Sequence, residues 1–498
     1  MSRRILPLIS LLLVAGCALK PPTTRVLPLT VAKAGTGQGS VYSTKGHVFC
    51  GADCTSHTVT LVHGAAIELF ARPSPGTRFV RWAEGCEGAI PVCTVHLDSA
   101  TLVEAFFEVR DDLPTCGQGR ALFARTPIDF DQIIAVSPIG HVGAPDHVFP
   151  VTRISLSVAD SHAPGAKDIG PVFVRSPGPL AITGVFKQRR TDTQRRTIWD
   201  YEIHLAPCRE MELILHHVQE VPADLQNLFG VPHWCAPGET ICLWLNLNVR
   251  VATGQILGKT GLGPELQLSA FDLRATPLTY ASIRRHYPEY LFLVCPTEYF
   301  TDTPVPTDPN RSHVRSTLEG RFWSRDGRAR RTVPPFCGDL NPDRPGTAQG
   351  RWYARGEPPA EERWHLSLVH DHVNPSRPVI SLGEAFRILP DFQRLPVGAW
   401  TFAPTTEWTG EALADYTNRD FWQVTAEARR VYCYHHLANH SGAPNDLANR
   451  VILLQMPDDR TLLMRRADAR TCEEAAALGF WNTSVNPPPL SNAVTFER

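Results

Sequence analysis

The sequence predicts a mainly β protein with several domains. Proline (43 residues) and glycine (35 residues) are frequent in the 498-residue chain, and long amphipathic helical patterns are scarce, which favours short strands joined by turns. A chain of this length is too long for one hydrophobic core, so about three domains are expected. The 49 basic and 50 acidic residues are well mixed. The composition therefore lacks the excess of basic residues that is typical of nucleic-acid-binding proteins.

The N-terminus has the pattern of a secretory signal peptide. Arg3 and Arg4 precede the mostly apolar run 5–15, which is shorter than the roughly 20 residues that a membrane-spanning helix needs. The stretch "VAGC", which ends at Cys17, resembles a bacterial lipobox. The resemblance implies that residues 1–17 are a signal peptide with a lipidated cysteine and that residues 18–25 are a tether. Ala18 follows the cysteine, where an inner-membrane retention signal would usually have aspartate, so we expect an outer-membrane anchor. A plain signal peptide is the alternative.

Twelve cysteines remain after Cys17, an even number in an oxidising compartment. We expect disulfides, and zinc bound by cysteines is the rival interpretation, which the absence of any CxxC pair disfavours. Three pairs are close in sequence, and the partners of the other six cysteines stay open. The predicted local pairs are Cys50 with Cys54, Cys86 with Cys93, and Cys235 with Cys242.

Residues 26–109 are expected to form a compact β module. The segments "HTVTLVHGAAIELFARP" and "CTVHLDSATLVEAFFE" alternate apolar and polar residues, as half-buried strands do. These segments, with "CGADC" and "TRFVRWAEGCEG", resemble the internalin-type B-repeat, also called the bacterial repeat domain. The resemblance implies a β-grasp-like spacer or adhesive unit without catalysis. Trp82 lies on an alternating strand and is expected in its core.

Two further units are expected at 110–304 and 305–498. The first contains strand patterns such as "RISLSV" and "ELQLSAF" and a short helix at "PADLQNLFG". The second is a C-terminal β-rich α+β domain with strands such as "VILLQMP" and "RTLLMRR" and a helix near "CEEAAALGF". The segment "DTPVPTDPNRS" is expected to link them.

The unit 110–304 resembles the lysostaphin-like zinc endopeptidases of peptidoglycan. The segments "SPIGHVGAPDHVFPVTRISLSV", "MELILHHVQEV" and "VRVATGQILGKTGLGPELQLSAFDLR" carry the resemblance, which implies a β-sandwich with a duplicated hybrid motif. Such a site needs three protein ligands and an open position for water. Its last strand usually carries His-x-His, because alternate residues share a face.

The ligand positions implied by this resemblance are replaced. Glu265 and Gln267 stand where His-x-His is expected, and Thr152 and Arg153 stand where the first-strand histidine is expected. Glutamine is a poor zinc ligand and a guanidinium repels a cation. Arg153, Glu265 and Gln267 are therefore predicted to line a groove that binds polar ligands without a metal.

Surviving histidines leave an alternative open. His147, His216 and Glu265 could form a shifted zinc site, whereas His217, adjacent to His216 on a strand, is expected to face the other way. His370 and His372 have the spacing of metal ligands but no recognisable third ligand. In the same unit Asp339, Asp343 and Asp371 are expected to be surface carboxylates, and Trp352 a core residue.

The sequence thus predicts a lipid-anchored outer-membrane protein that faces the periplasm or the cell surface. We expect no catalytic residues and no cofactor, and binding of peptidoglycan or another envelope protein in the peptidase-like groove. The alternatives are a zinc-dependent peptidoglycan endopeptidase and a purely structural surface or adhesion protein.

Overall fold

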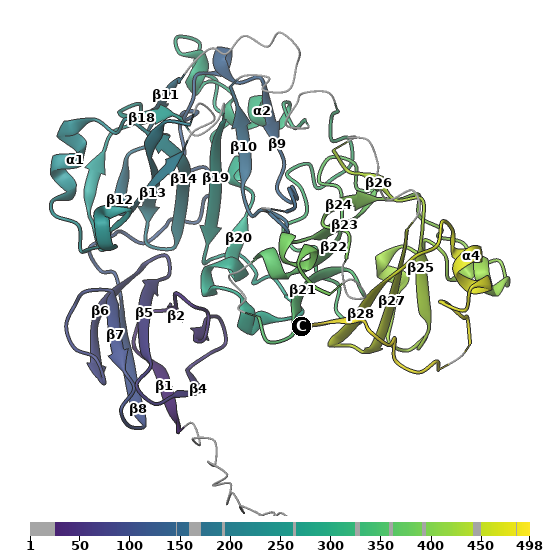
Figure 1. Ribbon diagram of the computed structural model, residues 1–498. Coiled ribbons are helices and arrows are strands. Elements are labelled where there is room, and N and C mark those ends of the chain that lie inside the picture. The colour runs from purple at the N-terminus through teal and green to yellow at the C-terminus, as the bar shows by residue number, and fades with distance from the viewer. Residues whose placement is uncertain are drawn as a thin grey trace, which may run out of the picture.

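The computed structural model describes residues 25–145, 147–158, 171–191, 195–261, 265–323, 329–357, 362–390, 395–441, 450–484 and 486–498. It confirms a mainly β protein built from several sheets, in three units that follow one another along the chain (Figure 1). The predicted lipobox and signal peptide lie outside the described residues. Among the described helices, none has the length and apolar character that a membrane crossing requires.

The N-terminal module consists of two four-stranded sheets, ordered β4-β1-β8-β6 and β3-β2-β5-β7. The strands are β1 (Val26–Gly35), β2 (Gly39–Ser43), β3 (Phe49–Cys50), β4 (Ser56–Val62), β5 (Ala66–Pro73), β6 (Thr77–Glu84), β7 (Val92–His96) and β8 (Thr101–Val109). Alternate residues of β1, β5 and β8 meet in one core, as their period-2 pattern predicts. Trp82 is 2% exposed, which confirms it as a core residue.

The central unit contains a twelve-stranded sheet whose main path is β15-β16-β12-β13-β14-β19-β10-β9. Its strands are β9 (Ala135–Ser137), β10 (Ile154–Ser157), β11 (Phe173–Arg175), β12 (Leu180–Thr191), β13 (Thr197–Cys208), β14 (Met211–Gln219), β15 (Trp234–Cys235), β16 (Ile241–Trp244), β17 (Val249–Val251), β18 (Ile256–Thr260), β19 (Glu265–Asp272) and β20 (Leu293–Val294). The expected short helix is α1 (Ala223–Phe229). The turn "ATGQ" joins β17 to β18 and places Gly254 at φ +81°, a backbone conformation that favours glycine.

The C-terminal unit is a nine-stranded sheet, ordered β25-β27-β28-β29-β21-β22-β23-β24-β26. Its strands are β21 (Gly350–Ala354), β22 (Leu366–His370), β23 (Pro378–Leu382), β24 (Gly398–Thr401), β25 (Val431–Tyr434), β26 (Ala438–Asn439), β27 (Val451–Asp458), β28 (Thr461–Ala467) and β29 (Val494–Glu497). Two short helices accompany it, α3 (Ala412–Asp415) and α4 (Cys472–Ala477). Trp352 is fully buried in its core, as predicted.

All twelve described cysteines form disulfides. The three predicted local pairs are present, which confirms them. The long-range bonds join Cys116 to Cys208, Cys295 to Cys337, and Cys433 to Cys472. No cysteine of the described chain is therefore left as a thiolate for zinc.

The core of the central unit extends beyond residue 304, where the sequence analysis placed its end. Val314 and Leu318 of helix α2 (Val314–Glu319), together with Phe322, pack in that core. A disulfide joins Cys337 to Cys295 of the same unit. The segment expected as a linker lies within the central unit. It is mostly exposed, but Asn310 Oδ1 accepts from the Phe130 backbone N–H at 2.7 Å and Asp308 is paired with Arg125 at 3.2 Å.

The three units are in close contact. The module meets the central unit through the Arg72–Glu289 ion pair (3.2 Å) and through a hydrogen bond from the Asn246 amide to the Phe79 carbonyl oxygen (2.9 Å). The central and C-terminal units meet where the Ser367 hydroxyl donates to the Val148 carbonyl oxygen at 2.6 Å. These contacts hold the units in one arrangement.

Candidate binding site between the module and the central sheet

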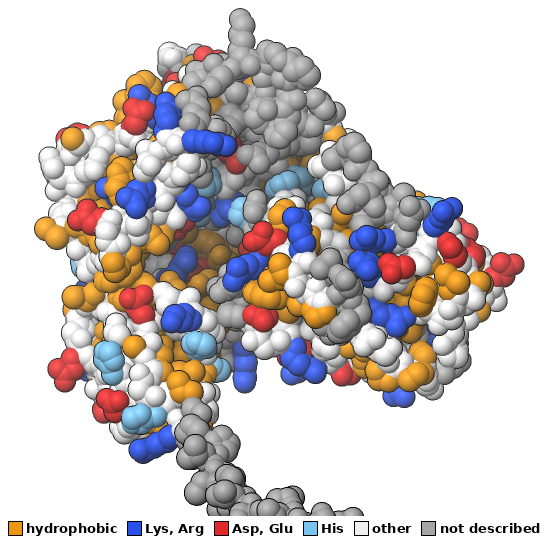
Figure 2. Space-filling view, viewed as in Figure 1, with side chains coloured by type: hydrophobic (Ala, Val, Ile, Leu, Met, Phe, Trp, Pro, Cys, Tyr) orange, Lys and Arg blue, Asp and Glu red, His pale blue; other side chains and the backbone are white. Residues whose placement is uncertain are grey.

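A cavity of about 480 Å³ lies between the N-terminal module and the central sheet. Tyr42, Phe70 and Arg72 line it from the module, and Glu202 and Trp234 line it from the sheet. The Phe70 and Trp234 rings meet edge-on, with centroids 5.3 Å apart. Figure 2 shows a hollow at this boundary in which hydrophobic and charged side chains lie close together. The cavity is thus a product of two units of the chain.

A chain of hydrogen-bonded side chains lies on the sheet side of the cavity. The His204 imidazole lies between two carboxylates, with Nε2 2.9 Å from Glu202 Oε1 and Nδ1 3.3 Å from Glu212 Oε2. The second oxygen of Glu202 is 2.9 Å from His216 Nδ1, and His216 Nε2 is 3.1 Å from Ser269 Oγ. Of these residues, Glu202, His204 and Glu212 line the cavity.

The charges of this chain follow from its contacts. Burial opposes the charged form of His204, but the carboxylates of Glu212 and Glu202 raise the pKa of His204 to about 10. Burial lowers the pKa of His216 to about 4, with help from the nearby charge of Arg153 and against the attraction of Glu202. Burial alone would raise the pKa of Glu202, but contacts with His216 and His204 hold it well below its usual range. Two carboxylates and one imidazolium therefore give this face a net negative charge at neutral pH.

The two adjacent histidines contact neighbouring carboxylates of one strand, so the prediction that they face opposite ways is wrong. His217 Nδ1 lies 3.1 Å from Asp200 Oδ2, two residues before Glu202 on β13. The register between β13 and β14 shifts at this point, and His217 has φ +66°. A β-bulge adds one residue to β14 and interrupts the alternation of faces.

Two of the three predicted groove residues, Glu265 and Gln267, are in contact, and the third, Arg153, interacts with their neighbour His216. Gln267 is paired with His216 on one side and with Ser155 on the other, and its amide Nε2 donates to Glu265 Oε1 at 2.8 Å. Arg153, which precedes β10, interacts electrostatically with His216. Glu265 is only 6% exposed. None of the three predicted residues is among those lining the described cavity.

The order Ser269, His216, Glu202 matches the connectivity of a nucleophile, a base and an orienting acid. Ser269 is 3% exposed in the interior of β19 and does not line the cavity. His216 does not line the cavity either, so the cavity gives a substrate carbonyl no direct access to this hydroxyl. We therefore treat the three residues as a polar network within the protein and assign no catalytic role to them.

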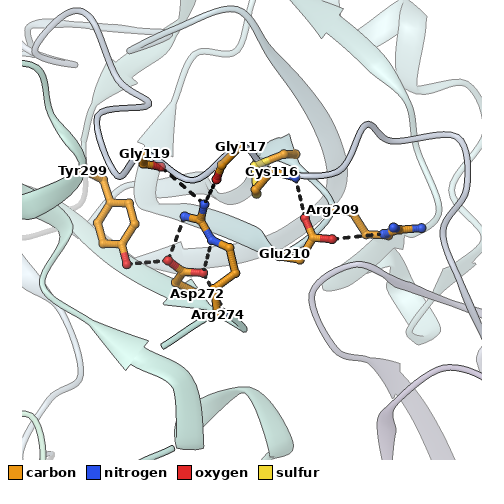
Figure 3. Close-up of a disulfide and its surroundings, with 9 residues drawn as sticks. Cys116, Gly117, Gly119, Arg209, Glu210, Asp272, Arg274 and Tyr299 are labelled. Atoms are coloured by element: carbon orange, nitrogen blue, oxygen red, sulfur yellow. Dashed lines mark hydrogen bonds and ion pairs between the residues drawn. A yellow bond between two sulfur atoms is a disulfide. The ribbon is translucent and has the colours of Figure 1, made fainter. Parts of the chain in front are cut away.

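The described residues contain one group of three or more side chains whose potential metal-ligand atoms all lie within 4.8 Å of one another: Cys116, Cys208 and Glu210. The two cysteines are joined in a disulfide, and Glu210 Oε2 accepts from the Cys116 backbone N–H at 2.7 Å (Figure 3). A disulfide offers no thiolate to a metal. The alternative ligands His147, His216 and Glu265 do not form such a group in the described chain.

The same close-up shows how the segment after the disulfide is held. The Arg274 guanidinium binds Asp272 with two hydrogen bonds, at 2.8 and 2.9 Å, and donates to the Gly117 carbonyl oxygen (Figure 3). The Tyr299 hydroxyl donates to Asp272 Oδ2 at 2.6 Å. These contacts tie the segment to the end of β19, so the group has a structural explanation.

The histidines and carboxylates of the C-terminal unit have partners that sequence reasoning did not predict. His370 is hydrogen-bonded to Asp420, and His372 is hydrogen-bonded to Ser137 of the central unit. The expectation of surface carboxylates is wrong for Asp343 and Asp371, which are 3% and 8% exposed. Each accepts backbone hydrogen bonds, which satisfies a carboxylate inside the protein.

No family model matches this sequence, and neither a curated protein nor a solved structure is similar to it.

Sequence reasoning did not identify the residues that line the cavity. One signal was available: in "DYEIHLAPC", Glu202 and His204 alternate with the apolar Tyr201, Ile203 and Leu205. Such a strand presents two titratable groups on one face. The contribution of Phe70 and Arg72 depends on how the module docks, which no local pattern reveals.

Proposed function

We propose that this chain is a lipid-anchored envelope protein that binds a fragment of cell-wall peptide in the cavity between the module and the central sheet. The observation that carries the proposal is a cavity with an aromatic wall facing a negatively charged hydrogen-bonded chain. The anchor is inferred from Cys17 and its preceding residues in the sequence.

The cavity has the size and composition of a small-ligand site. Its volume of about 480 Å³ falls within the several hundred cubic ångströms typical of such sites, which combine apolar walls with a few polar groups. Tyr42, Phe70 and Trp234 supply the apolar wall. The presence of this cavity argues against the purely structural alternative, which predicts packed loops here.

The charges favour a ligand with an amino group. Glu202 and Glu212 line the cavity with one shared cation, His204. Two arginines also line the cavity, but Arg72 is paired with Glu289 at 3.2 Å and Arg110 with Asp112 at 2.5 Å. An ammonium group of a peptide would bind beside the two carboxylates through charge-assisted hydrogen bonds. Peptide stems of the cell wall offer both such amines and apolar side chains.

The proposal is tested by titration calorimetry of the purified full-length protein with a stem peptide that carries a free side-chain amine. The same peptide with that amine acetylated serves as the ligand control. We expect Glu212→Gln and Glu202→Gln to weaken binding by about tenfold each, equivalent to about 1.4 kcal/mol. Glu220→Gln, on an exposed side chain paired with Lys259, is the matched control. Equal affinity for the free and the acetylated peptide would refute the proposal.

A further inference from the structure

A second cavity, of about 660 Å³, lies between the central and the C-terminal units. Ile139 and Gly140 line it from the central unit, and His370, His372 and Trp422 line it from the C-terminal unit. It is separate from the cavity beside the module, with which it shares no lining residue. We propose that this second cavity binds a neutral saccharide.

Its polar groups are held in place by neighbours. His370 Nε2 lies 3.1 Å from Asp420 Oδ1 and 3.2 Å from Oδ2. Asp371 accepts from the backbone N–H of Val373 at 2.8 Å and binds His440 Nε2 at 3.1 Å. A site whose polar side chains are already oriented loses little conformational entropy when a ligand binds.

His372 has an unused hydrogen-bonding atom. Its Nε2 lies 3.2 Å from Ser137 Oγ, and its backbone carbonyl accepts from Arg331 at 2.7 Å. Its Nδ1 is buried and has no hydrogen-bond partner among the residues that the structure describes. The residue is 8% exposed and lines the cavity. Buried polar atoms are rarely left unpaired. A ligand hydroxyl can either donate to this nitrogen or accept from it.

Trp422 gives the cavity an aromatic face. The residue lines the cavity and remains 50% exposed, so its ring is accessible to a ligand. The negative face of an indole ring attracts the weakly positive C–H groups on one side of a sugar ring. An exposed tryptophan beside oriented hydroxyl-binding groups therefore suits a saccharide.

The charges lining this cavity favour a neutral ligand. Two arginines, Arg331 and Arg344, face three aspartates, Asp339, Asp371 and Asp420, and Arg344 lies 3.9 Å from Asp339. The Asp371 and Asp420 carboxylates are already paired with histidines. A polyhydroxyl ligand can bind such a mixed lining, because each hydroxyl both donates and accepts.

The proposal is tested by titrating the full-length protein with neutral oligosaccharides of N-acetylglucosamine, glucose, mannose and galactose, followed by calorimetry and tryptophan fluorescence. We expect saturable binding of at least one of these probes. Trp422→Ala should weaken it by about tenfold or more, and Trp422→Tyr, which keeps an aromatic face, should retain most of it. His372→Gln, which retains a polar group toward Ser137 and deletes the unpaired nitrogen, should also weaken it.

Trp408→Ala is the matched control, since Trp408 is 55% exposed and does not line the cavity. Glu212→Gln, in the first cavity, should leave saccharide binding unchanged, which separates this proposal from the one above. The proposal is overturned if none of the four probe series binds, or if Trp422→Ala binds as tightly as the unaltered protein.

Discussion

The imidazole of His204 donates to Glu202 at 2.9 Å on the floor of the cavity beside the module. The same ring contacts Glu212 through its other nitrogen. A histidine held between two carboxylates is stabilised as the cation, which makes the stability of this region dependent on pH.

We expect His204 to stabilise the fold at neutral pH and to lose this effect in alkali. Its folded pKa is raised to about 10, whereas an unfolded histidine titrates near about 6.5. The contribution is complete below pH ~6.5 and disappears as the pH rises through the folded value. Urea midpoints measured from pH 6 to pH 10 should fall more steeply for the unaltered protein than for His204→Gln. If the urea midpoints of the two proteins fall equally with rising pH, the prediction is wrong.

Two other histidines should destabilise the fold in acid. The folded pKa of His216 is lowered to about 4 and that of His372 to about 3, in both cases chiefly by burial. Between these values and about 6.5 the unfolded chain binds more protons, so stability falls as the pH falls through that window. The double variant His216→Gln/His372→Gln should show a shallower loss of thermal midpoint between pH 6.5 and pH 4. If the thermal midpoint of the double variant falls with pH as steeply as that of the unaltered protein, other titrating groups cause the loss of stability in acid.

The disulfide that closes the longest loop should contribute most to the free energy of unfolding. Cys116 and Cys208 are separated by 92 residues, and Cys235 and Cys242 by 7. The chain-entropy relation assigns about 4.6 kcal/mol to the first loop and about 2.4 kcal/mol to the second. Replacing each pair by serines should therefore lower the free energy of unfolding more for Cys116/Cys208, as measured by urea titration. A larger loss for the short loop would exclude loop entropy as the main cause.

The docking of the module should depend on the pair Arg72–Glu289. The Glu289 side chain is 2% exposed, and Arg72 is its ion-pair partner across the boundary. Arg72→Met leaves a buried carboxylate without its cation, and we expect a loss of about 3 kcal/mol. Adding Glu289→Gln should recover most of that loss, because the unpaired charge is removed. Urea titration of both variants checks this, and a double variant no more stable than the single one would argue against it.

Several features of this protein follow from local sequence. Alternating apolar residues predicted strand β5, which buries every second side chain. The strands β19 and β27 were also expected from their apolar residues, and most of their side chains are buried on both faces. Short spacings predicted the disulfides within 50–54, 86–93 and 235–242. In these cases residues a few positions apart determine the contact.

Other features depend on which distant segments meet, and only the tertiary structure decided them. The partner of Cys116 is 92 residues away. The bulge at His217 appears only once β13 and β14 are paired. The binding cavity combines Phe70 and Arg72 of the module with Glu202 and Trp234 of the central sheet. The physical reason is that the alternation of residues along a strand specifies only which face of that strand is buried. The site forms where two such faces dock, and their fit to each other depends on residues of both units.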